Sequence, residues 1–276
     1  MENGEWRTTQ KRKTTLNLRM ENGEWRTPQK RKPTLNSQLS TLNSQFSTLL
    51  LLAVLVFSGC THNFHYPDSK IWAHGATGVW LGRQAEEKFD GMEIDLNYSA
   101  YQDAIFLGHE LCDTLKGLTL GAWFDSLRHP ETNYYWLDMK NLTTENAERI
   151  SHHICQEVRK WGIRDQLMVE SMNHQALKTL KDSGLHVILW VDNIYWSGRS
   201  EEEWEELTRQ QISELHPDAL SGDYHTFPLL PNTFPNHNIH IWDTPRQYND
   251  TNVAHTRTIA AHSAVKVVLV DYPEPI

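Results

Sequence analysis

FDGMEIDL, residues 89–96, places two carboxylates, Glu93 and Asp95, inside a short apolar run. Side chains two positions apart in a β-strand point to the same face, so the two carboxylates point together. Three other segments share its form, an apolar run with polar or charged residues at its end: IWAHG (71–75), IFLGHE (105–110) and YYWLDMK (134–140). These segments predict strands whose ends gather ionisable groups.

Short β-rich runs alternate with helical patterns from residue 70 to the end of the chain. The predicted strands span residues 71–74, 91–96, 134–139, 166–170, 186–190, 218–222, 238–242 and 265–270. The predicted helices span residues 79–89, 119–127, 144–161, 173–183, 201–215 and 252–263. Thr143 or Thr144 is the expected cap of the third helix, and Ser200 with Glu203 forms a capping box for the fifth. Eight strands with intervening helices predict a single-domain α/β fold, the (β/α)8 TIM-type barrel.

Residues 1–48 form a polar leader built from duplicated sequence. MENGEWRTTQKRKTTLN (1–17) recurs almost unchanged at 20–36, and TLNSQLS (34–40) recurs almost unchanged at 41–47. Repeats this polar cannot bury a core, and their periods match none of the stacked repeat architectures. We expect this leader to be disordered, or to be read from a start codon upstream of the true one.

Residues 49–60 are predicted to be the apolar region and lipobox of a signal peptide. Nine apolar residues, LLLLAVLVF, are too few to span a bilayer as a helix. The Ser-Gly-Cys that ends at Cys60 resembles the lipobox of bacterial lipoproteins, in which the cysteine becomes lipid-modified. We therefore expect an exported protein, anchored to the periplasmic or cell-surface face of a bacterial membrane by a lipid on Cys60. An ordinary secreted protein is the alternative. Residues 61–69 are the expected tether and residues 70–276 the barrel.

The part of the chain from residue 60 onward is acidic, with 31 Asp or Glu and 17 Lys or Arg residues, a formal charge of −14. This balance disfavours nucleic acid as a partner and does not favour anionic membranes. The sequence identifies no protein partner. Cys112 and Cys155 fall in a predicted loop and in the middle of a predicted helix, so we expect two free, partly buried thiols.

Six ionisable residues lie at or just beyond the C-terminal ends of the predicted strands. They are three carboxylates, one lysine and two histidines: Glu93, Asp95, Asp138, Lys140, His74 and His109. Active sites of TIM barrels lie at this face, so we expect the six to converge. Carboxylates suit Mg²⁺ or Ca²⁺, and histidine suits proton transfer near neutral pH. These are the groups that a divalent metal holding a phosphodiester between two proton-transfer groups would need.

Each of these residues also has a purely structural explanation. Glu93 and Asp95 fit a salt-bridged pair, although burying them among apolar neighbours without a partner or a metal is costly. The histidines fit satisfied loop histidines, and Asp138 with Lys140 fits an internal ion pair. The functional interpretation is preferred because all of them are expected at one face of one barrel.

The segments AHG, MEIDL, GHE and LDMK, in this order, resemble motifs of the glycerophosphodiester phosphodiesterase and phospholipase-C-like superfamily, and the resemblance continues to the closing VVLVDYPEPI. It implies a barrel with a Mg²⁺ or Ca²⁺ site and a small-molecule phosphodiester substrate. By the resemblance, three residues are metal ligands: Glu93, Asp95 and Asp138. His74 and His109 are implied as general acid and base, and Lys140 as a contact to the phosphate.

The chain also departs from the family's motifs. The family's His-Arg-Gly is His74-Gly75-Ala76 here, so an arginine that binds phosphate in the family is missing at this position. Arg83 is a candidate replacement if the short loop before it folds back. The family's common His-Asp is His109-Glu110. These departures affect what is bound more than how the chain folds.

Further residues are candidates for the wall of the site. Trp190 and Trp242 follow two predicted strands and are expected to line a substrate pocket. Glu170 is either a further ligand or a carboxylate that favours the start of a helix. Two other functions stay open: a non-catalytic barrel that binds a metal or ligand, and a glycoside hydrolase that uses carboxylates such as Glu170 and Asp271.

Overall fold

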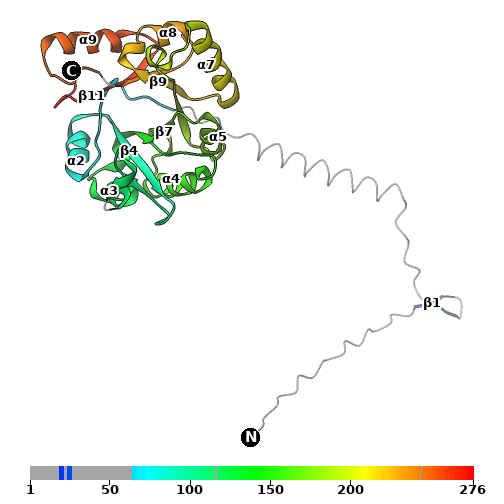
Figure 1. The fold of residues 1–276 in the computed structure, drawn as a ribbon. Helices are drawn as coiled ribbons and strands as arrows, with labels where there is room; N and C mark the ends of the chain where they lie inside the picture. Colours follow the sequence, from blue (N-terminus) through cyan, green and yellow to red (C-terminus); the bar gives the residue numbers. More distant parts are fainter. Residues whose placement is uncertain (1–18, 22–23, 27–63, 116, 243) are drawn as a thin grey trace. The chain divides into compact units, whose positions relative to one another are not determined.

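The computed structural model describes residues 19–21, 24–26 and 64–276, apart from residues 116 and 243 (Figure 1). Two short strands, β1 (Arg19–Glu21) and β2 (Glu24–Arg26), pair antiparallel within the duplicated leader. The expectations for the rest of the leader, for the signal peptide and for Cys60 lie outside the described residues. Residues 64–276 form a separate unit, the barrel.

Eight parallel strands close into a barrel, as predicted. They are β3 (Ile71–Ala73), β4 (Gly91–Ser99), β6 (Tyr134–Met139), β7 (Leu167–Ser171), β8 (His186–Trp190), β9 (Ala219–Asp223), β10 (Ile239–Trp242) and β11 (Val265–Val270). Each pairs in parallel with the next, and the pairings of β3 with both β11 and β4 complete the ring. The chain is a single-domain TIM barrel, and the predicted strand positions are confirmed to within three residues.

Helices surround the strands (Figure 1). The six predicted ones are α2 (Val79–Lys88), α3 (Leu120–Ser126), α4 (Ala147–Trp161), α5 (His174–Asp182), α7 (Glu201–Leu215) and α9 (Asp250–Ala261). Two short helices were not predicted: α6 (Ile194–Ser197) and α8 (Leu229–Thr233). Short 3-10 turns were not predicted either: η1 (Leu111–Leu115), η2 (Pro130–Thr132), η3 (Arg164–Gln166) and η4 (Tyr224–Thr226).

The helix ends follow local hydrogen bonding. Ser200 accepts from the Glu203 amide and Glu203 reaches back to the Ser200 amide, so the predicted capping box is confirmed. The predicted cap of α4 at Thr143 or Thr144 is wrong. The helix is preceded by Asn146, whose side-chain oxygen accepts from the amide of Thr143 instead. The chain therefore makes a turn before α4 begins.

A further strand, outside the eight predicted for the barrel, matters for the site. β4 continues to Ser99, three residues beyond its predicted end, and there pairs antiparallel with β5 (Ala104–Leu107). The turn between them holds Asp103 at φ 48°, and the Tyr98 hydroxyl donates to its carboxylate at 2.8 Å. IFLGHE (105–110) indicates this strand, but its antiparallel pairing with the end of β4 was not predicted. The hairpin brings His109 to the rim of the barrel.

The core has two layers. One packs between the barrel and the helices, and on α4 it includes Ile150, Ile154 and Val158, spaced four residues apart. The other fills the barrel and contains Trp72, Trp136, Met168, Ile188, Ala219, Val267 and Leu269. A Cβ added to Gly91 would lie 2.3 Å from the Trp72 ring, so the glycine lets this tryptophan pack beside β4.

Residues 64–69, expected as part of a tether, instead close one end of the barrel. The Phe64 ring packs against Tyr134 and His186, which begin two strands. The Tyr66 hydroxyl lies 3.0 Å from Nε2 of His240, a fully buried histidine. This closed end is the N-terminal end of the strands, so access to the interior is from the opposite end.

Among the described residues both cysteines are free, as expected, but only Cys155 is buried and Cys112 is exposed. Cys112 is exposed because it lies on η1 at the surface rather than inside a helix that packs on the barrel. No helix in the described part of the chain is both long enough and apolar enough to cross a membrane.

Candidate active site

A cavity of about 430 Å³ lies at the C-terminal ends of the strands. All eight residues proposed for a metal, for proton transfer or for substrate line it: His74, Glu93, Asp95, His109, Asp138, Lys140, Trp190 and Trp242. They come from loops and strand ends spread over residues 74–242, so only barrel closure brings them together. Four further residues complete the lining: Trp136, Glu170, Arg246 and Leu269.

Three carboxylates form a cluster in this cavity. Asp95 on β4 is paired in register with Asp138 on β6, which is in turn paired with Glu170 on β7. Glu93 lies two residues before Asp95 and on the same face. One oxygen from each of Glu93, Asp95 and Asp138 lies within 4.8 Å of the others. The strand register therefore produces the convergence that the sequence predicted.

The carboxylate of Glu93 is buried, and only one of its two oxygens accepts a hydrogen bond. Its Oε2 accepts from the backbone amide of Gly75 at 2.9 Å, whereas Oε1 is buried without a hydrogen-bond partner among the described residues. Burial, together with the charge of Asp95, raises the pKa of Glu93 to about 8. A buried acceptor without a donor costs free energy unless a cation or proton satisfies it. Glu93 therefore favours a bound cation.

Lys140 links the other two carboxylates. Its Nζ lies 2.7 Å from Oδ1 of Asp95 and also donates to Oδ2 of Asp138. Burial lowers the pKa of Lys140, but the charges of Asp138 and Asp95 outweigh it and raise the pKa overall. Burial raises the pKa of Asp138, and Lys140 opposes this effect. With one positive and three negative charges, the cluster remains acidic whenever its carboxylates are ionised.

The residues present fit a divalent metal with oxygen ligands. The donors are three carboxylates, which suit Mg²⁺ or Ca²⁺ rather than softer ions. The unpartnered Oε1 of Glu93 supplies a ligand atom that nothing else in the described structure uses. The opposing observation is Lys140, which already neutralises part of the charge of Asp95 and Asp138.

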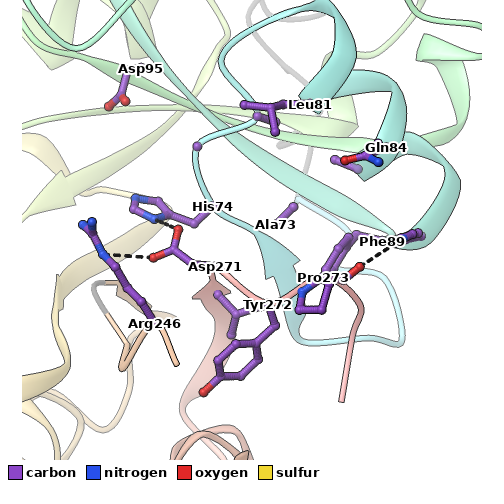
Figure 2. A pocket seen from close by; sticks show the side chains of 15 residues that line it. Ala73, His74, Leu81, Gln84, Phe89, Asp95, Arg246, Asp271, Tyr272 and Pro273 are labelled. Carbon is purple, nitrogen blue, oxygen red and sulfur yellow. Dashed lines mark hydrogen bonds and ion pairs between the residues drawn. The ribbon is translucent and has the colours of Figure 1, made fainter. Parts of the chain in front are cut away.

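His74 lies beside this cluster and is held by Asp271 (Figure 2). Its Nδ1 is 2.9 Å from Oδ1 of Asp271, and its Nε2 is 3.8 Å from Oε2 of Glu93. Burial lowers the pKa of His74, but the hydrogen bond to Asp271 and the charge of Glu93 raise it to about 8. Arg246 Nε lies 3.1 Å from the second oxygen of Asp271. One carboxylate thus orients a histidine and a guanidinium at the cavity.

His109 reaches the cavity from the β4–β5 hairpin. It follows Gly108, which has φ 145° and whose amide donates to the carbonyl of Asp95 at 3.0 Å. A Cβ on Gly108 would lie 2.3 Å from the side chain of Asp113, so this position requires glycine. His109 is two-thirds exposed, and its Nδ1 is 2.9 Å from Oε1 of Glu110. His109 is therefore the more accessible of the two histidines.

Glu170 has no carboxylate oxygen left unpaired. Its oxygens accept from the indole of Trp136 at 3.0 Å and from the hydroxyl of Ser221. Burial raises its pKa well above the usual range. These bonds explain Glu170 better than an effect on the following helix does. Trp190 and Trp242 meet edge to face across the wall, with ring centroids 5.2 Å apart.

The sequence did not predict that Asp271 contacts both His74 and Arg246 at the site. Asp271, considered only for a glycoside hydrolase, follows β11 directly and fits the strand-end rule that identified the others. Arg246 lies four residues beyond β10 in a loop, where no periodic or motif signal marks it. The proposed role of Arg83 is wrong: it does not line the cavity, and its Nε donates to the carbonyl of Ser126 on α3.

Comparison with known proteins gives a result at the level of structure. No protein-family model matches the sequence, and no curated protein matches it. A phosphodiesterase from Oleispira antarctica, solved with the product sn-glycerol-3-phosphate, superimposes with a TM-score of 0.57. The two sequences are 14% identical, over 75% of this chain and 94% of the other. A glycerophosphodiester phosphodiesterase from Parabacteroides distasonis has a TM-score of 0.54 at 14% identity, over 75% of this chain and 95% of the other.

The chain has the fold of the glycerophosphodiester phosphodiesterases. The fold expected from the order of the motifs is therefore confirmed. At this level of identity the likeness is one of architecture.

Proposed function

We propose that the protein is a metal-dependent phosphodiesterase that hydrolyses a glycerophosphodiester or a related phospholipid-derived diester. The observation that carries this proposal is the convergence of three carboxylates, with a buried unpartnered oxygen on Glu93, between two histidines in one cavity. The fold shared with known phosphodiesterases supports it.

The proposed roles follow from the geometry. Glu93, Asp95 and Asp138 would hold Mg²⁺ or Ca²⁺, which supplies charge stabilisation to the phosphoryl oxygens when bound. His74, oriented by Asp271, and His109 exchange protons with the attacking water and the leaving alcohol.

Two kinds of contact complete the proposed substrate site. Lys140 contributes a positive charge near the phosphate, although two carboxylates share it. Trp190 and Trp242 form an apolar wall for the remainder of the substrate.

Hydrolysis of glycerophosphocholine and bis-p-nitrophenyl phosphate with added Mg²⁺ or Ca²⁺ tests this proposal. We expect turnover that a chelator abolishes and that Glu93→Ala and His109→Ala both reduce severely. Arg83→Gln is a suitable control, because Arg83 is charged but does not line the cavity. Unchanged activity in Glu93→Ala or His109→Ala would refute the assignment.

A second function, binding without turnover, is supported by the position of Lys140. Its contacts with Asp95 and Asp138 compensate part of the charge of two of the three proposed metal ligands without any ion. Metal-dependent thermal stabilisation without hydrolysis of any diester would favour this alternative. The glycoside hydrolase has less support, because Asp271 is bonded to His74 and both Glu170 oxygens are occupied.

We also propose that the protein is exported and that a lipid on Cys60 anchors it to a bacterial membrane. The apolar run that ends at Phe57 and the Ser-Gly-Cys that follows it support this proposal. Loss of membrane association in Cys60→Ser tests this proposal, and unchanged association would contradict it.

A further inference from the structure

A second cavity of about 400 Å³ adjoins the candidate active site on the other side of His74. It lies between α2 and the segment that follows β11, as Figure 2 shows for Leu81, Gln84, Tyr272 and Pro273. Three residues line both cavities: His74, Asp95 and Arg246. A substrate that contacts His74 in the first cavity can therefore extend into the second cavity.

The walls of the second cavity combine small apolar residues with polar and charged ones. The apolar lining consists of Ala73, Ala76, Leu81, Ala85, Phe89, Val270, Tyr272 and Pro273. Its volume falls within the range of roughly 300–1,000 Å³ that encloses small-molecule ligands. A three-carbon alcohol would leave most of this space empty, so the cavity suits a longer group.

The charges in this cavity favour an anion. Lys88, the last residue of α2, donates from Nζ to the carbonyl of Pro273 at 2.8 Å. No carboxylate in the described part of the chain forms an ion pair with it, so its positive charge remains available. Asp271, by contrast, shares its oxygens between His74 and Arg246, and Asp95 contacts Lys140. A cationic substrate group would therefore meet the positive charges of Lys88 and Arg246, and each carboxylate in the cavity already contacts a positively charged or histidine side chain.

Gln84 adds a polar group to the same wall. It lies one helical turn before Lys88 on α2 and is half-buried. The side-chain amide of Gln84 forms no hydrogen bond with the other described residues, although Gln84 lines the cavity. An amide and an ammonium four residues apart on one helix face can contact the same phosphate group.

We propose that this second cavity binds the leaving alcohol of the phosphodiester, and that this alcohol carries a further phosphate group recognised by Lys88 and Gln84. The inference rests on the proposed phosphodiesterase function and names its substrate class. In the reaction, water forms the new bond to phosphorus and the bond from phosphorus to the alcohol oxygen breaks. His109 accepts a proton from the water, and His74 donates one to the departing alcohol, which lies on its side of the site.

Two diesters that differ in one phosphate test this assignment. Glycerophosphoglycerol lacks the further phosphate, and bis(glycerophospho)glycerol has it. We expect the wild-type protein to show a kcat/KM about tenfold higher for the second, beyond the twofold due to its two equivalent diester groups. Lys88→Gln should abolish this preference. Arg83→Gln removes a positive charge from the same helix outside the cavity and should preserve the preference.

Binding of the same two diesters, measured by calorimetry, examines the cavity without turnover. Tighter binding of bis(glycerophospho)glycerol that Lys88→Gln removes and Arg83→Gln retains supports the assignment. Such binding without hydrolysis would overturn the proposed enzymatic function but not the binding site. Equal binding of both diesters, or a preference that Lys88→Gln leaves intact, would overturn the inference.

Discussion

The two ends of the barrel shift the pKa of a histidine in opposite directions. At the closed end His240 is fully buried among aromatic rings, and burial lowers its pKa to about 3. At the open end burial also lowers the pKa of His74, but Asp271 and Glu93 outweigh it and the pKa rises to about 8. Neighbouring carboxylates, and not burial alone, therefore decide which histidine can carry a proton near neutral pH.

The same contrast holds for the groups around each histidine. His240 faces the hydroxyl of Tyr66 and the indole rings of Trp72 and Trp136, which stabilise a neutral imidazole. The open end instead concentrates carboxylates that are costly to bury without a cation. We infer that the closed end maintains stability and that the open end sacrifices some stability for function.

Among the substitutions considered, Glu93→Gln should have the largest effect on activity and stability at the open end. The substitution keeps the shape of the side chain and removes a proposed metal ligand, so activity should fall by about a thousandfold or more. In the absence of metal the variant should unfold at a higher temperature than the wild type, because a buried carboxylate is removed. Steady-state kinetics and thermal unfolding check both. A large fall in the unfolding temperature of Glu93→Gln would contradict this prediction, because unfolding could then explain the loss of activity.

His74→Gln should lower kcat by roughly 10² to 10⁴ by removing a proton-transfer group. Asp271→Asn should cost less, roughly 10- to 100-fold, because it leaves the imidazole in place but weakens its orientation. Kinetics of both single variants and the double variant measure the coupling. Additive losses would show that Asp271 does not act through His74.

The pH dependence of stability should depend on His240. Its folded pKa of about 3 lies below the unfolded value near 6.5, so the unfolded state takes up protons first as the pH falls. The stability is fully present above about pH 6.5 and declines below it, by about 2 kcal/mol between pH 7.5 and 5. Denaturant unfolding of His240→Gln should lack this part of the decline. Parallel pH profiles for wild type and variant would refute the effect.

Tyr66→Phe should have the smallest effect and sharpen the contrast most cleanly. It removes only the hydroxyl that contacts His240 and should lower the free energy of unfolding by about 1 kcal/mol. Its kcat and KM should equal those of the wild type, because Tyr66 is at the end opposite the cavity. Chemical denaturation and kinetics on the same preparation test this, and altered kinetics would show that the two ends are coupled.

The barrel was predictable because its strands are regular. FDGMEIDL and YYWLDMK combine apolar runs with paired charges, and strand periodicity alone places Glu93 beside Asp95 and Asp138 beside Lys140. The rule that barrel sites lie at strand ends then predicted the cavity. These inferences need only local sequence and a known architecture.

What could not be predicted depends on long-range packing. Arg246 reaches Asp271 from a loop, and no local pattern encodes the path of that loop. The packing of Phe64 and Tyr66 at the closed end likewise depends on residues 70 to 174 positions away. The wrong assignment of Arg83 has the same cause, because helix α3 captures its side chain. Contacts between distant segments decide these positions.

The central claim is that the open end holds a divalent metal through Glu93, Asp95 and Asp138. Titration of Mg²⁺ and Ca²⁺ into the purified protein by calorimetry tests it most directly. We predict one site per chain that is lost in Glu93→Gln and retained in His240→Gln. Absence of binding to the wild-type protein, or equal binding to Glu93→Gln, would contradict the account.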